Sequence, residues 1–326
     1  MGRVGGGRDT ICDVRSPSEY EEDHVPGAIN YPVLSDTERV VVGTMYKKTS
    51  PFAARREGAA LVANNLADIL RDPRWAELSP DSNVLVYCWR GGDRSLSLAH
   101  TLSRVGWNIF VVEAGYKGYR KSVRQVLEKM PEYSFHMIGG PTGSAKGLFL
   151  ESLEGLGAQV LDLEGAANHK GSVLGESIEG PQPSQKLFES KISEKLKGTI
   201  LLPPIRRNTC RILSRSPRRP SYSHGQKFTT FTPNRFESMP SRLELTNGVF
   251  VGFSQHRPIF VEDESYMVGS LHLPASLQKA IRYAPRTILH VPREERVKWT
   301  RSQYKHFETT HTAILHKKIE KLVPLR

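Results

Sequence analysis

Apolar residues fall into short strand-like runs and longer helix-like segments from the start of the chain. Ile11–Val14 is a short apolar piece, and Ser82–Cys88 is a run rich in β-forming side chains that stops at a glycine-containing loop. Between these two runs, residues 53–70 carry apolar positions at helical spacing. The first part of the chain therefore predicts two buried strands with a helix between them.

The same alternation continues after the loop. Residues 95–105 have apolar positions at helical spacing, and Gly106 is a predicted helix end. Residues 108–112 are the next predicted strand. Strand, loop, helix and strand in this order predict an α/β domain with a largely parallel sheet.

A second α/β pattern begins at Phe135–Gly140, where a short strand meets a glycine-rich turn. A helix is predicted over residues 146–156, and further strands over 160–163, 258–264 and 286–291. The chain therefore repeats the α/β class in its second half.

A length of 326 residues fits two domains, because single hydrophobic cores rarely grow to that size. The predicted domains are residues 1–130 and 131–326. Hydrophobic residues make up 38% of the chain, as in ordinary soluble proteins, and no apolar run reaches the roughly 20 residues of a membrane helix. We expect no membrane span.

Residues 197–255 interrupt the second domain with a segment rich in Pro, Ser and Arg and poor in periodicity. The segment has ten basic and two acidic residues, so it carries most of the chain's formal charge of +12. Such a basic excess is typical of proteins that bind polyanions, including nucleic acid. We interpret the segment as a disordered, low-complexity insertion, and a dedicated RNA-binding insertion is the alternative.

The three cysteines, Cys12, Cys88 and Cys210, are too few and too scattered for a disulfide framework or a zinc site. We therefore predict a reducing compartment and no metal. The first residues lack the apolar core of a signal peptide, so a cytoplasmic location is expected, with an organellar one left open.

Cys88 lies where a predicted strand runs into a loop, directly before a predicted helix. Backbone N–H groups of residues 89–94 and the positive helix N-terminus can converge on its sulfur and stabilise an anion there. Cys88 is the predicted nucleophile and Arg94 its catalytic partner; a buried structural cysteine is the alternative. The predicted anion cradle consists of Trp89, Arg90, Gly91, Gly92, Asp93 and Ser95.

Residues 140–147 follow the frame of a phosphate-binding P-loop between a strand and a helix. Ala145 replaces the last glycine of the frame and Gly147 replaces the hydroxyl residue that holds Mg²⁺, which puts metal-assisted nucleotide hydrolysis in doubt. A phosphate or diphosphate site is favoured over a glycine-rich turn without function. The predicted phosphate-binding residues are Gly140, Thr142, Gly143, Ser144 and Lys146.

Three acids end the predicted strand 258–264, at the edge where ligands of open α/β sheets bind. Glu262, Asp263 and Glu264 could therefore supply a metal ligand or a general-base carboxylate, and Glu262 and Asp263 are the candidate acid/base residues. A solvated acidic turn is the equally weighted alternative.

Two stretches, Asp13–Pro32 and Gly106–Tyr119, resemble the opening and closing motifs of the rhodanese family. The resemblance implies a cysteine that takes sulfur from a donor as a persulfide and passes it to an acceptor. The loop from Cys88 to Arg94 is one residue longer than the common sulfurtransferase loop and has the Cys-x5-Arg spacing of tyrosine phosphatases. A phosphatase or an arsenate-reductase-like enzyme is therefore an alternative, and selenophosphate would fit the same loop.

The combination of a rhodanese-like domain with a P-loop domain resembles the tRNA 2-selenouridine synthase family. The stretches that carry this resemblance are residues 87–95, 163–172, 182–189, 260–265 and 271–274. The resemblance implies replacement of sulfur by selenium at the wobble 2-thiouridine of tRNA, with selenophosphate and geranyl diphosphate as co-substrates and an S-geranylated intermediate.

In that family, Cys88 would handle selenium, and Lys146 would hold the phosphate or diphosphate of a small phosphorylated substrate. Asn168, His169 and Lys170 match a family block that either contacts tRNA or substrate, or has a packing role. An inactive rhodanese-like binding protein is a further alternative, because the P-loop is degenerate.

Overall fold

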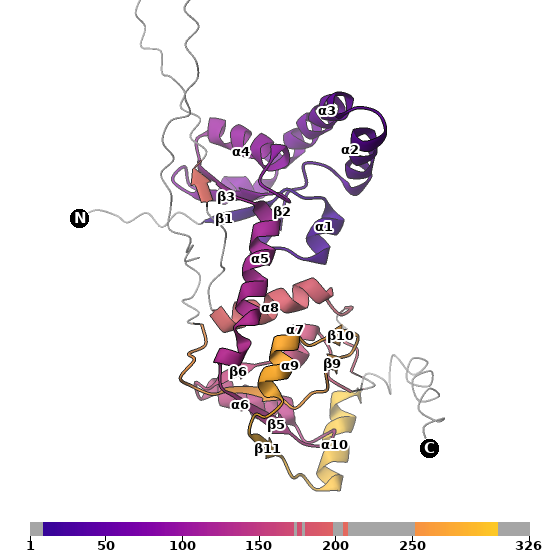
Figure 1. The fold of residues 1–326 in the computed structure, drawn as a ribbon, viewed down its shortest axis with the longest axis vertical. Coiled ribbons are helices and arrows are strands. Elements are labelled where there is room, and N and C mark those ends of the chain that lie inside the picture. Colours follow the sequence, from indigo (N-terminus) through magenta and orange to yellow (C-terminus); the bar gives the residue numbers. More distant parts are fainter. Residues whose placement is uncertain (1–8, 173–174, 178–179, 198–204, 208–251, 306–326) are drawn as a thin grey trace, which may run out of the picture. The chain divides into compact units, whose positions relative to one another are not determined.

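The computed structural model describes residues 9–172, 175–177, 180–197, 205–207 and 252–305. These residues form two compact units, each built around a largely parallel sheet (Figure 1). The first unit holds residues 27–119 with the first strand, and the second holds residues 22–26 and most of the described residues after 119. The predicted α/β class is confirmed, while the domain limits 1–130 and 131–326 stay a prediction.

The first unit contains a five-stranded sheet in the order β2-β1-β3-β4-β7. Its strands are β1 (Thr10–Asp13), β2 (Ala28–Asn30), β3 (Asn83–Tyr87), β4 (Asn108–Val112) and β7 (Ile205–Arg207). The first four pair in parallel, and β7 pairs antiparallel with β4. The strands predicted at 11–14, 82–88 and 108–112 are thus confirmed.

The short strand β7 lies inside the segment 197–255, for which the sequence predicted disorder. That prediction is wrong for residues 205–207, because their backbone pairs with the outer edge of β4 and satisfies polar groups that an open edge would leave unpaired. Three residues are too few to give a periodic pattern. Residues 198–204 and 208–251 lie outside the described residues.

The helices of the first unit confirm the predicted helical segments. They are α1 (Pro17–Glu22), α2 (Asp36–Lys48), α3 (Pro51–Leu70), the 3-10 helix η1 (Pro73–Glu77) and α4 (Asp93–Val105). In α4 the buried residues Ser95, Leu98 and Leu102 recur every three or four positions, so one face packs on the sheet. Gly106 ends α4 with a φ of +128°, a conformation that glycine adopts readily.

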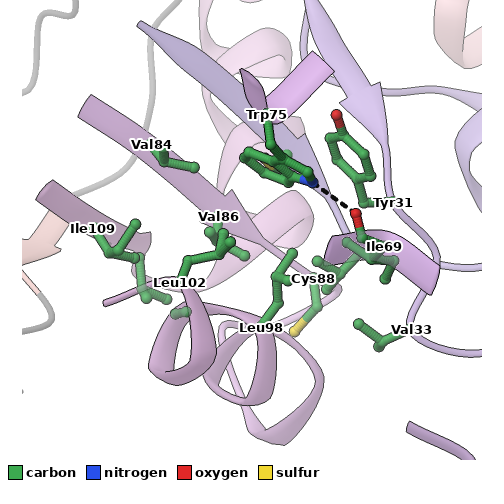
Figure 2. Packing of buried hydrophobic residues seen from close by; sticks show 14 residues of the cluster. Tyr31, Val33, Ile69, Trp75, Val84, Val86, Cys88, Leu98, Leu102 and Ile109 are labelled. Atoms are coloured by element: carbon green, nitrogen blue, oxygen red, sulfur yellow. Dashed lines mark hydrogen bonds between the residues drawn. The ribbon is translucent and has the colours of Figure 1, made fainter. Parts of the chain in front are cut away.

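A hydrophobic cluster fills the space between the first sheet and its helices (Figure 2). Tyr31 stacks on Trp75 with ring centroids 4.8 Å apart, and the indole N–H of Trp75 donates to the Ile69 carbonyl at 2.7 Å. Cys88 belongs to this cluster, and Figure 2 shows its sulfur beside Leu98. The loop after Cys88 therefore starts from a densely packed base.

The second unit contains a four-stranded parallel sheet in the order β11-β5-β8-β6. Its strands are β5 (Phe135–Gly139), β6 (Gln159–Leu161), β8 (Ile259–Glu262) and β11 (Arg286–Ile288). A separate antiparallel pair consists of β9 (Met267–Val268) and β10 (Leu271–His272). All four strands of the parallel sheet coincide with strands predicted from the sequence.

Helix α5 (Gly115–Glu128) and the 3-10 helix η2 (Met130–Glu132) precede β5. The remaining helices are α6 (Lys146–Gly155), α7 (Leu163–Ala167), α8 (Gln185–Lys197), α9 (Ala275–Ile281) and α10 (Arg293–Gln303). In the part of the chain that the structure describes, no helix combines the length and apolarity needed to cross a bilayer.

The stretch 182–185 fixes the β9–β10 pair to the rest of the second unit. Gln182 donates to the Val268 carbonyl at 2.9 Å and accepts from the Ser270 N–H at 2.8 Å. Gln185 accepts from the His272 N–H at 2.9 Å. The stretch 182–189, which carried part of the family resemblance in the sequence, therefore has a structural role.

Candidate active site

Cys88 directly follows β3, and the loop after it leads into α4. Its side chain is 3% exposed, and its Sγ lies 3.3 Å from the hydroxyl of Ser95, which is buried in the first turn of α4. Gly92 is the N-cap of α4 and no side chain caps this helix end. The sequence prediction of a cysteine between a strand and a helix N-terminus is confirmed, although the sulfur is more deeply buried than a surface nucleophile.

The backbone amides of the Cys88 loop are available to an anion. Among the described residues, the N–H groups of residues 89–94 donate to no acceptor, and the first amides of α4 that do so are those of Ser95 and Leu96, both to Gly92. Two loop carbonyls, by contrast, are occupied: Tyr116 N–H bonds to the Cys88 carbonyl at 2.8 Å and Lys117 N–H to that of Trp89 at 3.1 Å. The loop therefore offers a run of free backbone donors next to Cys88.

Two glycines make this loop conformation attainable. Gly91 has a φ of +73°, and a Cβ there would lie 2.7 Å from the Val112 carbonyl oxygen. Gly115 has a φ of +52°, and a Cβ there would lie 2.9 Å from the Gly91 nitrogen and against the Cys88 carbonyl. Both positions need a residue without a side chain, which explains the glycines at 91 and 115.

The charged and aromatic residues of the loop have distinct places. Arg94 donates to Glu19 at 2.8 Å. Burial raises the pKa of Glu19, but the bond and charge of Arg94, together with Ser16 and Arg15, bring this pKa below its usual value. Trp89 packs on Tyr116 with ring centroids 5.3 Å apart, whereas Arg90 and Asp93 are exposed. The guanidinium of Arg94 is thus engaged by a carboxylate instead of facing the sulfur freely.

Cys12 offers a contrast within the same unit. It is fully buried in β1, and this burial raises the pKa of its thiol far above the usual value. Cys12 is therefore an inert core residue, and the third cysteine, Cys210, lies outside the described residues.

The phosphate-binding loop predicted at 140–147 joins β5 to α6. Ala145, in the place of the last glycine of the frame, has a φ of +57° and so retains the left-handed conformation that glycine favours there. Lys146 Nζ donates to the Gly140 carbonyl at 3.1 Å, across the loop. The amides of Thr142, Gly143 and Lys146 donate to no acceptor among the described residues, so the loop has the donors of an anion site.

Two further features close this loop around a small space. Ser144 is 3% exposed, and its hydroxyl has no hydrogen-bond partner in the described chain. Helix α10 packs against Gly143, where a Cβ would lie 2.6 Å from the Arg296 carbonyl oxygen. A cavity of about 340 Å³ is lined by this loop, by Lys170–Ser172 and by the end of α10.

The three acids at the end of β8 have different surroundings. Glu262 is 1% exposed and accepts from the Leu163 N–H at 3.2 Å; burial, with the charge of Asp162, raises its pKa to about 8. Asp263 turns towards β11, with its carboxylate 3.9 Å from Arg286. Glu264 lines the cavity at the phosphate-binding loop. Glu262, one of the two predicted acid/base residues, lines a cavity on the α7 side.

Sequence analysis missed Glu164, which faces Glu264 across the same cavity. A Cβ on Gly171 would lie 2.5 Å from Oε1 of each carboxyl group, so both groups approach one point. Burial and the neighbouring Glu264 raise the pKa of Glu164 to about 7, and Lys146 opposes the shift. The available signal was an acid just after the strand at 160–163, at the same sheet edge as the β8 acids.

The block Asn168–Lys170 combines packing with a cavity contact. Asn168 ends α7 in the left-handed conformation and donates to the Gly180 carbonyl at 3.0 Å. Lys170 lines the cavity and donates to Gln303 at 3.0 Å. Among the described residues, no group of three or more His, Cys, Asp or Glu side chains is arranged to hold a metal ion.

Two family models match the chain. A rhodanese-like domain matches residues 2–122, and the model described as tRNA 2-selenouridine synthase AAA domain matches residues 133–199 and 235–321. The predicted insertion 197–255 is wider than the stretch that the second model leaves unmatched. These matches confirm the resemblance drawn from the sequence.

Three similar proteins carry the name tRNA 2-selenouridine synthase. Identity is 29% over 296 residues with that of Sulfurovum sp. (strain NBC37-1), covering 90% of this chain and 65% of the relative. Identity is 35% over 184 residues with the protein of Psychromonas ingrahamii, covering 56% of this chain and 48% of the relative. Identity is 29% over 298 residues with the protein of Cronobacter sakazakii, covering 90% of this chain and 64% of the relative. The chain thus spans about half to two thirds of the length of these relatives.

Proposed function

Because this chain joins a rhodanese-like domain to the AAA domain of the tRNA 2-selenouridine synthases, we propose that it replaces sulfur by selenium at the wobble 2-thiouridine of tRNA. Selenophosphate is the proposed selenium donor, and the reaction passes through an S-geranylated uridine formed from geranyl diphosphate. The reaction takes place in the cytoplasm. The name that these relatives share, tRNA 2-selenouridine synthase, supports the tRNA substrate and the selenium chemistry.

The observation that carries this proposal is the set of unpaired amides on residues 89–94 beside Cys88. A tetrahedral phosphate group accepts several hydrogen bonds at once, and six free donors at a helix N-terminus are suited to hold one. Selenophosphate bound there would present its selenium to the Cys88 sulfur. The Ser95 hydroxyl, 3.3 Å from that sulfur, accepts from the thiol and donates to the Gly92 carbonyl at 2.9 Å. Once the thiol proton is lost, rotation of this hydroxyl away from Gly92 would let it donate to the thiolate.

The phosphate-binding loop in the second unit has the complementary task. Its free amides and Lys146 would bind the diphosphate of geranyl diphosphate, and Lys146 would leave the Gly140 carbonyl to pair with the incoming anion. A leaving diphosphate needs charge stabilisation but no hydrolysis, so the glycine at position 147 is compatible with this role. Glu164 and Glu264 line the same cavity and limit how much negative charge it accepts.

The competing assignment is a Cys-x5-Arg phosphatase or arsenate reductase. Those enzymes need the arginine to grip the tetrahedral anion, but Arg94 is held by Glu19 at 2.8 Å. A phosphatase would also leave the phosphate-binding loop of the second unit without a purpose. Hydrolysis of para-nitrophenyl phosphate that depends on Arg94 would favour this competitor.

The test is the Cys88→Ala variant of the full chain. Incubation with thiolated tRNA, selenophosphate and geranyl diphosphate, followed by mass spectrometry of the nucleosides, is expected to show selenouridine with the wild type and none with the variant. Affinity for tRNA should stay within about two-fold, because the substitution removes a buried atom and little surface. A Cys210→Ser variant serves as the control and should retain activity. Undiminished selenouridine formation by Cys88→Ala would overturn the assignment.

A further inference from the structure

A helical hairpin in the first unit has little cover from the rest of the molecule. Helix α2 contains no buried residue in 13 positions. Its start is nevertheless firmly held: Ser35 and Glu38 form a capping box, and Asn65 of α3 donates to Glu38 at 2.8 Å. A well-anchored helix that contributes nothing to the core is available for contact with another molecule.

The hairpin is strongly basic. From Arg39 to Arg56 the sequence has five basic residues and no acidic one. These residues, called here the basic hairpin, are Arg39, Lys47, Lys48, Arg55 and Arg56. All but the half-buried Arg39 are exposed, so their charges face solvent without an acidic neighbour in the segment. A polyanion is the occupant that complements this surface.

Exposed aromatic rings accompany the charges near the turn between α2 and α3. Phe52 is 77% exposed and Tyr46 is 51% exposed, on either side of Thr49 and Ser50. Aromatic rings among cations are the usual platform for unpaired nucleic-acid bases, because a base stacks on the ring while its backbone phosphates meet Lys and Arg. The basic hairpin therefore fits a single-stranded loop of RNA better than a uniform anionic surface.

The hairpin adjoins the Cys88 loop. Glu19 of α1 accepts from Arg94 at 2.8 Å and lies 3.9 Å from Nε of Arg39 in α2, so one carboxylate touches both elements. A cavity of about 640 Å³ beside it is lined by the acids Glu19 and Asp36 and, from α2, by the cations Arg39, Lys47 and Lys48. The first turn of α2 thus lies beside the Cys88 loop, and an RNA loop seated along the hairpin would extend from there to the turn before α3.

We propose that the basic hairpin is the docking surface for the anticodon loop of tRNA, with phosphates on its cations and an unpaired base stacked on Phe52. This inference rests on the proposed function, because it takes tRNA as the substrate. A nucleotide inside the anticodon loop must reach Cys88, and a docking surface joined to the Cys88 loop through Glu19 satisfies that requirement.

The first test removes four exposed cations from the full chain. The variant combines K47Q, K48Q, R55Q and R56Q. Binding is measured by fluorescence anisotropy with a labelled anticodon stem-loop RNA that carries 2-thiouridine, over a series of KCl concentrations. The slope of log affinity against log salt is negative, and each lost phosphate contact reduces its magnitude by about 0.7. The slope of the variant should therefore be shallower than that of the wild type by about 3. At physiological salt the dissociation constant should rise on the order of 100-fold.

A matched control removes the same charge from other places. Its four cations are each paired with an acid: Arg71 with Asp68, Lys186 with Glu22, Lys195 with Glu154 and Lys298 with Glu295. The variant R71Q, K186Q, K195Q and K298Q should bind the RNA within about two-fold of the wild type, since paired surface charges contribute little. Equal losses in both variants would show a net-charge effect and overturn the proposal.

A second test separates stacking from charge. Phe52→Ala should weaken binding about ten-fold and Phe52→Trp should preserve it, because the base needs an aromatic face. Phe52→Leu keeps an apolar side chain and should behave like Phe52→Ala. If Phe52→Leu binds like the wild type, the ring does not stack on a base and the proposed contact is wrong.

The remaining outcomes separate this inference from the proposed function. If the wild type forms selenouridine and the four-cation variant keeps its RNA affinity, the docking surface is wrong and the proposed function stands. If the wild type forms no selenouridine but binds the stem-loop through the hairpin, the reaction is wrong and the surface stands. Hairpin-dependent sedimentation with phosphatidylglycerol vesicles, without any effect on RNA binding, would replace RNA by a lipid surface.

Discussion

A methyl group added at Gly91 provides a direct test of the Cys88 loop. In Gly91→Ala the new Cβ would lie 2.7 Å from the Val112 carbonyl oxygen, at a backbone φ of +73°. Gly27 has the same φ of +73°, but a Cβ there meets nothing within 4 Å. The pair Gly91→Ala and Gly27→Ala therefore shares the backbone strain and differs in the steric contact.

The expected magnitudes follow from these two contributions. A left-handed alanine costs about 1–2 kcal/mol, which both variants lose in free energy of unfolding. Gly91→Ala must also push the loop and β4 apart until the contact reaches an ordinary distance, and such overpacking costs about 1–3 kcal/mol more. A shift of this kind moves the amides of residues 89–94 relative to the Cys88 sulfur. Since a misplacement of about 1 Å can cost 100-fold in rate, we expect selenium transfer to fall at least about ten-fold.

Two measurements decide the matter. Urea unfolding gives the free energies of unfolding, and nucleoside mass spectrometry gives the initial rate of selenouridine formation for the same preparations. Gly27→Ala should be modestly destabilised and fully active below its unfolding transition, whereas Gly91→Ala should lose both stability and rate. If both variants keep the wild-type rate, the geometry of the loop around Cys88 does not govern the reaction.

Two further predictions concern the buried acids of the second unit. The pKa of Glu262 is raised from 4.5 to about 8, so the folded unit holds a proton that the unfolded chain releases. This contribution to stability is complete below pH 4.5 and is lost as the pH rises through 8. In thermal unfolding scans at a series of pH values, the melting temperature of Glu262→Gln should fall less with rising pH than that of the wild type. An equal fall in both proteins would contradict this origin of the pH dependence. The pKa of Glu164 is raised to about 7, so calorimetric binding of inorganic diphosphate should weaken as the pH rises through 7. Glu164→Gln should remove that dependence, and an unchanged pH profile would exclude the contact.

The sequence predicted those elements whose pattern is local. Residues 108–112 form a strand and Gly106 ends the preceding helix, because a short apolar run and a glycine with positive φ are properties of a few neighbouring positions. Helix α2 was not predicted, because Val40, Val41 and Val42 are consecutive and give no stripe on one helical face. Its side chains are not buried, so no core requirement shaped their spacing.

The candidate site was predictable to the same extent. The cysteine loop and the phosphate-binding loop are continuous in sequence, and the structure places each between a strand and a helix. Glu164 and Glu264 come from separate segments, and they meet because β6 and β8 are neighbours in the sheet, with Leu161 opposite Val261. Side chains alternate along a strand, so Glu262 and Asp263 point to opposite sides, which the acidic run alone did not reveal.

The pairing of β7 with β4 has a consequence for synthesis of the chain on the ribosome. The sheet of the first unit is complete only after residues 205–207 have left the exit tunnel, long after β4 at residues 108–112. At usual elongation rates, that gap lasts on the order of ten seconds. During this interval the nascent unit presents an unprotected sheet edge, so folding helpers or neighbouring nascent chains have their best opportunity to engage it there.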